Sequence, residues 1–314
     1  MDIEAFIEEA VEDLRSRISG KAIVAASGGV DSTVVACLAH RAIGDRLIPI
    51  YVDTGYMRKG EGDNVRSIFE DLGIGLNYVE ASERFYKALE GVIEPEAKRK
   101  VIGGTFIDVF IDAAGETDAE HLIQGTIAPD WIESGGGIRD TIKSHHNVGG
   151  LPEELGIDLI EPIRDLYKDE VREVAKFLKI PAHDRQPFPG PGLAIRILGE
   201  ATPDRTRIVR EACHIAEEEI LKGAKEGHYE EPWQYFAVLL PVRSVGVHGD
   251  LRAYGYTIVV RAVYSLDGMT AAYCPIAHEV LDRISRRISN EMGEEVTRIV
   301  YDITNKPPST IEWE

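Results

Sequence analysis

The sequence is short of cysteine and of basic residues, and it contains no long apolar run. Its three cysteines (Cys37, Cys213 and Cys274) are an odd number without a CxxC pair, which argues against a disulfide framework and against a cysteine zinc site. Its apolar runs are far shorter than the roughly 18 residues that a membrane helix needs. The N-terminal residues are acidic and amphipathic, unlike a signal peptide. We therefore expect a cytoplasmic protein with no membrane partner.

The charge balance is strongly acidic. Asp and Glu number 54 against 35 Lys and Arg, a formal net charge of −19. Nucleic-acid binding requires a basic surface, so we expect no nucleic-acid partner. Small phosphorylated ligands remain compatible, because they need only a local positive site. The 314 residues are 44% hydrophobic and 28% charged, an ordinary globular composition. At roughly 150 residues per domain, this length predicts two domains.

Strands and helices alternate in the first part of the chain. Apolar runs predict strands at residues 22–26, 47–52, 76–79, 121–124 and 159–161, and helical spacing predicts helices at 3–18, 30–41, 66–72 and 168–178. This alternation is typical of a parallel sheet with helices on both faces, the α/β class. Ligands of such sheets bind beyond the carboxyl ends of the strands.

A domain boundary is predicted near residue 190. Residues 186–192 contain three prolines and two glycines, which no helix interior tolerates. Strands at 236–241, 254–263 and 298–303 and a helix at 276–292 then indicate a small α+β module. We expect domains at 1–190 and 191–314. The long stretch 126–156 is weakly patterned, which is typical of a functional or mobile loop.

Residues 27–32, Ser-Gly-Gly-Val-Asp-Ser, follow a predicted strand directly and open a helix. Two glycines permit close approach of the backbone to a ligand, and the first amides of a helix attract anions. The acidic Asp31 fits an anion site when a cation such as Mg²⁺ lies between it and phosphates. The loop lacks the GK[ST] ending of a Walker motif. A glycine turn with Ser/Asp capping is the alternative interpretation.

This loop resembles the pyrophosphatase loop of the N-type ATP pyrophosphatases, which cleave ATP between its α and β phosphates and adenylylate an oxygen. Further segments resemble the GMP synthase family, in the same order along essentially the whole chain. They are residues 95–103 (PEAKRKVIG), 124–130 (QGTIAPD), 132–134 (IES), 142–152 (IKSHHNVGGLP), 187–192 (PFPGPG), 241–247 (PVRSVGV) and 306–314 (KPPSTIEWE). The chain is similar to the ATP-pyrophosphatase subunit of the two-subunit type common in archaea.

The resemblance implies a ligase that converts ATP, XMP and ammonia to GMP, AMP and pyrophosphate. The predicted phosphate-loop strand begins near residue 22, which leaves no room for an N-terminal glutaminase domain, and no cysteine has a nucleophile context. We therefore expect ammonia from a separate glutaminase subunit. The family also implies ATP as co-substrate, Mg²⁺, and a homodimer formed by the C-terminal module, which completes the XMP site.

The resemblance assigns site residues in three groups. ATP binding is implied for Ser27, Gly28, Gly29, Val30, Asp31, Ser32, Thr33, Asp53, Gly125 and Thr126, with Asp31 also as the metal ligand. Catalytic roles are implied for Asp31, Asp130, Glu133, Lys143, His145 and His146, all but the first in a lid over ATP. XMP binding is implied for Arg99 and Lys306 at the phosphate and for Ile311 and Glu312 at the base.

Several of these residues have other interpretations. Taken alone, the adjacent histidines are compatible with zinc binding, a capped turn or, most simply, an exposed loop. Lys168 fits either a phosphate contact or an ordinary helix start. Lys98, Arg99 and Lys100 would otherwise form a solvated charge run, and a polar C-terminal segment usually frays.

Other functions fit the sequence less well than the ligase does. An NAD synthetase would not be expected to end in KPPSTIEWE, and a tRNA thiolation enzyme requires catalytic cysteines and a basic surface. An RNA-binding KH module predicts a GxxG loop among basic residues, but the GxxG at 246–249 is followed by Asp250.

Overall fold

The computed structural model describes residues 2–129, 156–181, 185–266 and 268–314. The chain forms two compact units. The first comprises Met1–Thr54, Gly60–Ser82 and Gly103–Arg185, and the second comprises Gly55–Lys59, Glu83–Ile102 and Gln186–Glu314. The last change of unit falls between Arg185 and Gln186, and two earlier segments of the chain also belong to the second unit, so the domain limits 1–190 and 191–314 stay a prediction.

The first unit is built on a five-stranded sheet, whose neighbouring strands are all parallel. Its strands are β1 (Ala22–Ala25), β2 (Leu47–Asp53), β3 (Asn77–Glu80), β4 (His121–Ile123) and β5 (Asp158–Ile160), in the spatial order β3-β2-β1-β4-β5. The predicted parallel sheet is confirmed. The order reverses between β1 and β4, which marks the carboxyl ends of these two strands as the expected ligand site.

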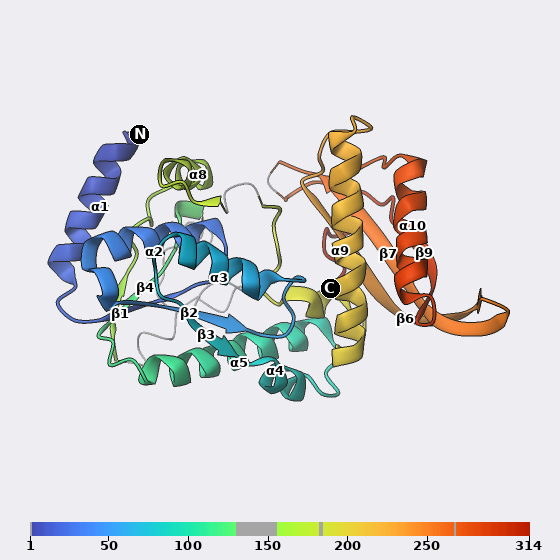
Figure 1. Ribbon diagram of the computed structural model, residues 1–314, viewed down its shortest axis with the longest axis horizontal. Helices are drawn as coiled ribbons and strands as arrows, with labels where there is room; N and C mark the ends of the chain where they lie inside the picture. The colour runs from blue at the N-terminus through green and yellow to red at the C-terminus, as the bar shows by residue number, and fades with distance from the viewer. Residues whose placement is uncertain (1, 130–155, 182–184, 267) are drawn as a thin grey trace. The chain divides into compact units, whose positions relative to one another are not determined.

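Helices cover this sheet. Helices α1 (Ile3–Arg17), α2 (Val30–Ile43) and α8 (Lys168–Phe177) pack against one another. Of α5 (Pro95–Gly115), the part that belongs to the first unit, residues 103–115, lies on the opposite side of the sheet in Figure 1. Helix α3 (Glu61–Asp71) follows β2, and a 3-10 turn at Gly44–Arg46 links α2 to β2. Helix α3 begins five residues earlier than the sequence indicates, because Gly60 at φ +70° serves as its N-cap.

The second unit has a mixed sheet covered by helices. Strands β6 (Gln234–His248) and β7 (Leu251–Tyr264) form a long antiparallel hairpin, β8 (Ala272–Tyr273) pairs antiparallel with β7, and β9 (Val296–Tyr301) pairs parallel with β7. Helix α9 (Pro203–Lys225) packs on β6, and α10 (His278–Met292) packs on α9 and β9 (Figure 1). Helix α4 (Ser82–Ala88) and a 3-10 turn at Gly192–Arg196 complete the elements. The expected α+β module is confirmed.

The segment Gly55–Lys59 is anchored within the second unit at several points. The Tyr56 hydroxyl donates to the Ala201 carbonyl at 2.7 Å, and Arg210 donates through Nε to the Met57 carbonyl at 3.1 Å. The backbone of Leu193 donates to Tyr56 at 2.7 Å. Gly192 lies at φ +63°, and a Cβ there would be 2.3 Å from the Tyr56 carbonyl oxygen, so only glycine fits.

In the part of the chain that the structure describes, none of the helices combines the length and the apolar character needed to cross a bilayer.

Candidate active site

The phosphate loop joins β1 to α2 in the first unit. Gly29 is the N-cap of α2, and no side chain in the described part of the chain caps the helix, so the first amides of α2 have no partner from the helix itself. The Ser27 and Ser32 hydroxyls are 2.9 Å apart, and the Ser32 hydroxyl lies 3.1 Å from the Gly29 carbonyl, to which it donates. The loop is therefore held in shape by its own side chains, with backbone amides available for an anion.

Close packing makes Gly28 necessary. Its φ is +75°, and a Cβ there would be 2.6 Å from Val65 and 3.1 Å from the Glu61 carboxylate. A side chain at this position would be strained and would also collide with α3. The Thr33 hydroxyl donates to the Gly29 carbonyl at 2.8 Å and is fully buried, so it supports the loop from inside the helix.

Gly125 and Thr126, which follow β4, lie against the start of α2. A Cβ on Gly125 would be 3.2 Å from the carbonyl carbon of Asp31 and 3.3 Å from the Ser32 amide nitrogen. Thr126 is buried, and its hydroxyl has no hydrogen-bond partner among the described residues. The sheet thus brings these residues to the phosphate loop, at the point where the strand order reverses.

Asp31 pairs with Lys168, the first residue of α8. Lys168 Nζ lies 2.6 Å from Asp31 Oδ2, whereas Asp31 Oδ1 is buried without a partner in the described part of the chain. Both side chains are partly exposed. The pair places a cation and an anion beside the phosphate loop, and it leaves one carboxylate oxygen available as a ligand.

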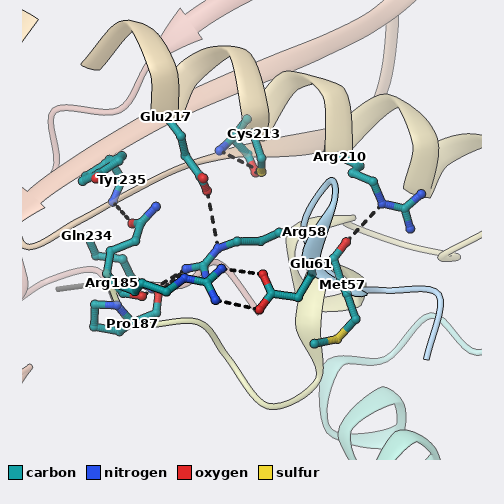
Figure 2. A network of polar contacts seen from close by, with 12 residues as sticks. Met57, Arg58, Glu61, Arg185, Pro187, Arg210, Cys213, Glu217, Gln234 and Tyr235 are labelled. Atoms are coloured by element: carbon teal, nitrogen blue, oxygen red, sulfur yellow. Dashed lines mark hydrogen bonds and ion pairs between the residues drawn. The ribbon is translucent and has the colours of Figure 1, made fainter. Parts of the chain in front are cut away.

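Two further carboxylates lie in this region of the first unit. Arg185 holds Glu61 through two hydrogen bonds, Nη1 to Oε1 at 2.9 Å and Nη2 to Oε2 at 2.5 Å (Figure 2). At the end of β2, the Tyr78 hydroxyl donates to Asp53 Oδ2 at 2.5 Å. Burial and this hydrogen bond raise the pKa of Tyr78 above its ordinary value, so Tyr78 stays protonated and remains a donor to Asp53.

In the second unit, the C-terminal segment 302–314 is wrapped around a buried arginine. Arg261 on β7 is fully buried and donates to Asp302 Oδ2 at 2.6 Å. It also donates to the carbonyls of Thr304, Thr310 and Ile311 at 2.9–3.0 Å and to the Ser309 hydroxyl at 3.0 Å. The segment does not fray, because one guanidinium satisfies three of its carbonyl groups.

A second buried arginine holds Glu312. Arg196 Nε donates to Oε2 at 3.1 Å and Nη2 donates to Oε1 at 2.7 Å, and Gln234 Nε2 donates to the same Oε1 at 2.9 Å. The Arg196 guanidinium also lies 4.3 Å from the ring centre of Phe236 and 5.1 Å from that of Phe188. Three donated hydrogen bonds therefore hold the Glu312 carboxylate in a fixed position.

Lys98 is buried, and not part of a solvated charge run. Its ammonium donates to the Ile197 carbonyl at 2.6 Å, to the Ala194 carbonyl at 3.2 Å and to the Glu314 carboxylate. Burial lowers the pKa of Lys98, and the Glu314 carboxylate opposes that shift. The next residue, Arg99, donates to the Glu314 carbonyl, so α5 holds the end of the segment through two neighbouring cations.

The other residues predicted for XMP lie on the same segment. Lys306 Nζ donates to the Gly268 carbonyl at 2.8 Å, and its backbone pairs with Ala271. Ile311 is buried. Arg99, Lys306, Ile311 and Glu312 thus all belong to the second unit, whereas the residues predicted for ATP all belong to the first. Asp130, Glu133, Lys143, His145 and His146 lie outside the described residues.

Arg196, Gln234 and Arg261 are not among the residues singled out from the sequence, and Lys98 is named there only as a member of a charge run. A signal does exist for the two arginines. Arg196 interrupts the apolar run LAIRIL at 193–198, and Arg261 interrupts IVVRAV at 258–263. A charge inside an otherwise buried run requires an internal partner, so it marks a structural or functional position.

The cysteines are ordinary core residues. All three are free and buried. Burial raises the pKa of Cys37 and of Cys213 to about 11, so their thiols are protonated at neutral pH. A protonated, buried thiol is a poor nucleophile.

The first unit defines the class of this protein. A glycine-rich loop opens α2 at the reversal point of a parallel sheet, and residues 1–105 match the family described as NAD synthase. Together they define a synthetase of the ATP-pyrophosphatase class. Residues 221–313 match a second family, described as GMP synthase C terminal domain.

Relatives match along the whole chain. The chain is 60% identical to a Thermococcus kodakarensis protein described as the B-subunit of GMP synthase [glutamine-hydrolyzing], with 99% of each chain covered. It is 58% identical to the Pyrococcus horikoshii protein and 56% identical to the Methanopyrus kandleri protein of the same description, with 99–100% of each chain covered. The chain belongs to the family of GMP synthase B-subunits.

Replacing Lys98 with Met should destabilise the second unit by about 3–5 kcal/mol, because it leaves the Glu314 carboxylate buried without its partner. Urea unfolding followed by tryptophan fluorescence measures the change. The matched control is Lys100→Met, two residues along α5 and exposed, which should change stability by less than about 0.5 kcal/mol. Equal effects of the two substitutions would show that the buried pair contributes no stability.

Proposed function

We propose that this chain is the synthetase subunit of a GMP synthase. It adenylylates XMP with ATP, releasing pyrophosphate, and ammonia from a separate glutaminase subunit then displaces AMP to give GMP. The observation that carries the proposal is the match to GMP synthase B-subunits over the whole chain, including both units. The phosphate loop and the ordered C-terminal segment support it.

The first unit supplies the ATP site in this proposal. The amides at the start of α2 and the Ser27 and Ser32 hydroxyls bind the β and γ phosphates. Gly125 and Thr126 line the loop, and Asp53, fixed by Tyr78, lies at the end of the neighbouring strand, where we place the adenosine. Lys168 supplies a positive charge beside the phosphates.

The residues at the phosphate loop fit Mg²⁺. Asp31 offers a carboxylate oxygen without a partner among the described residues. Mg²⁺ is usually held by one or two carboxylates together with substrate phosphates and water, so a cage of three or more protein ligands is not required. Bound there, Mg²⁺ would neutralise charge on the pyrophosphate leaving group.

Catalysis then depends mainly on position and on electrostatics. The oxygen at carbon 2 of xanthine is a poor leaving group, and adenylylation makes it a good one. The loop amides and Lys168 hold the pyrophosphate so that it leaves in line with the attacking oxygen. Because the adenylylated base is prone to hydrolysis, exclusion of water is part of the task.

The second unit supplies the XMP site in this proposal. Arg99 and Lys306 bind the phosphate, and Ile311 and Glu312 contact the base. An NAD synthetase is the runner-up within the same class, since residues 1–105 match that family. The match of residues 221–313 to the GMP synthase C terminal domain favours XMP as the acceptor.

The proposal is tested by incubating the purified chain with ATP, Mg²⁺, XMP and ammonium at alkaline pH and measuring GMP and pyrophosphate. A parallel reaction contains glutamine in place of ammonium. We expect GMP from ammonium and none from glutamine until a glutaminase subunit is added. If pyrophosphate is released with another acceptor and XMP yields no GMP, the assignment of the phosphate loop to ATP stands and XMP is rejected as the substrate.

Asp31→Asn should lower pyrophosphate release by at least about 100-fold, because it removes the charged ligand while keeping the size of the side chain. Lys168→Met, which removes the partner of Asp31 but keeps the carboxylate, should have a smaller effect and should leave the Mg²⁺ requirement unchanged. Thermal unfolding checks that both variants fold. Full activity of Asp31→Asn would refute the assignment of Asp31 to the metal.

We also propose a homodimer formed through the β6–β7 hairpin. Val245, Val247 and Tyr254 lie on one face of the hairpin and are 56%, 77% and 62% exposed. Light scattering should give twice the mass of one chain, and Val247→Glu should lower it. The control Ile93→Glu changes a comparably exposed apolar residue outside the hairpin and should leave the mass unchanged. A wild-type mass of one chain would reject the dimer.

We place this reaction in the cytoplasm. Three free, buried cysteines fit a reducing compartment.

A further inference from the structure

Arg196 has more donors than its neighbours satisfy. Its side chain is fully buried, two of its nitrogens bind Glu312, and its Nη1 has no hydrogen-bond partner in the described part of the chain. Burial of a cation to this depth is unfavourable, and two stacked rings and one carboxylate compensate for it. Because burial of the Arg196 guanidinium is unfavourable, we looked to Glu312, the carboxylate that it binds, for its role.

Glu312 reaches the surface where Arg196 does not. The Glu312 side chain is 17% exposed, whereas that of Arg196 is 0% exposed. Oε1 accepts from both Arg196 and Gln234, which uses its two lone pairs, whereas Oε2 accepts only from Arg196 among the residues that the structure describes. The carboxylate therefore keeps one acceptor position, and its direction is set by Arg196.

The surroundings of this pair are themselves tied together. Gln234 also donates to the Pro187 carbonyl at 3.3 Å, and the backbone of Tyr235 donates to the Gln186 side chain at 2.9 Å (Figure 2). The centre of the Phe188 ring lies 4.3 Å from the Arg58 guanidinium and 5.1 Å from the Arg196 guanidinium. The 186–188 segment thus packs over Arg196 and keeps its side chain from turning away from Glu312.

We propose that Arg196 is a positioning residue for purine selection: it holds Glu312 so that Oε2 accepts a hydrogen bond from a ring N–H of a 6-oxopurine nucleotide. Xanthine and guanine carry a hydrogen on N1, whereas N1 of adenine is an acceptor and would face the carboxylate without a proton. The arrangement therefore admits XMP and rejects AMP and ATP from the base site. This inference rests on the proposed function, which assigns Glu312 to the base.

The test measures steady-state kinetics of GMP formation from ammonium. Arg196→Met should raise the KM for XMP by about 10- to 100-fold, the effect of losing the alignment of one charge-assisted hydrogen bond. The KM for ATP and the kcat at saturating XMP should stay within about threefold of the wild type, because Arg196 acts only on the base contact. Arg196→Lys keeps the charge but not the two parallel bonds, so its KM for XMP should lie between those of the wild type and Arg196→Met.

A double-mutant cycle separates positioning from general damage. Since Arg196 acts through Glu312, Arg196→Met combined with Glu312→Gln should raise the KM for XMP no more than Glu312→Gln alone. The matched control is Arg205→Met, which removes another arginine of the same unit whose guanidinium donates to the Leu198 and Glu200 carbonyls. It should change neither KM by more than about threefold.

The outcomes are distinguishable. An unchanged KM for XMP in Arg196→Met, equal rises of both KM values, or effects that multiply in the double variant would each overturn the inference while GMP formation continues. If Arg196→Met does not fold, Arg196→Lys and Glu312→Gln serve in its place, with the same criterion on the KM for XMP. Absence of GMP formation by the wild-type chain would instead overturn the proposed function, and this inference with it.

Discussion

The second unit depends on three buried cations. Lys98, Arg196 and Arg261 are each 0% exposed, and each binds residues of the segment 302–314. Without these bonds the segment would be an extended polar chain of thirteen residues with no strand or helix of its own. Burial of a charge is unfavourable unless the charge is paired and hydrogen-bonded. The three cations therefore need the segment as a partner, and the segment needs the three cations to hold its fold. The position of Glu312 follows from this mutual dependence.

The sheet and the ligand site of the first unit can be predicted from the sequence, because the patterns that indicate them lie within short segments. Strands β1 and β2 are short, mostly buried apolar runs, and the glycines of the phosphate loop follow β1 directly, so the carboxyl edge of the sheet could be predicted as the ligand site. Only the pairing of distant strands brings Gly125 against Asp31. In a parallel sheet, however, the carboxyl ends of all strands lie at one edge, so their proximity could be expected. The Asp31–Lys168 ion pair is different, since it joins residues 137 apart in the chain and required the structure.

The second unit is harder to predict from the sequence, because its key contacts join residues far apart in the chain. Thr202 and Pro203 are typical helix N-terminal signals and do mark the start of α9, which is not among the helices expected from the sequence. The burial of Lys98 could not be predicted, because the adjacent Arg99 and Lys100 indicate a solvated charge run. Its partners are Ala194, Ile197 and Glu314, all about 100 residues or more away. Long-range pairing of this kind leaves no periodicity in the sequence. Only a charge inside an apolar run, as at Arg196 and Arg261, gives a local hint.

The phosphate loop and Glu312 depend on the fold of the chain in different ways. The phosphate loop is held by hydrogen bonds within six residues and by packing against α3 and Gly125, so its shape depends on the first unit. Glu312, by contrast, is in place only when the segment 302–314 is folded onto its three cations. A nucleotide that binds Glu312 therefore binds the folded second unit and not the unfolded one, and it must stabilise that unit by mass action. Recognition of the base and folding of the second unit are then two measures of the same set of buried bonds.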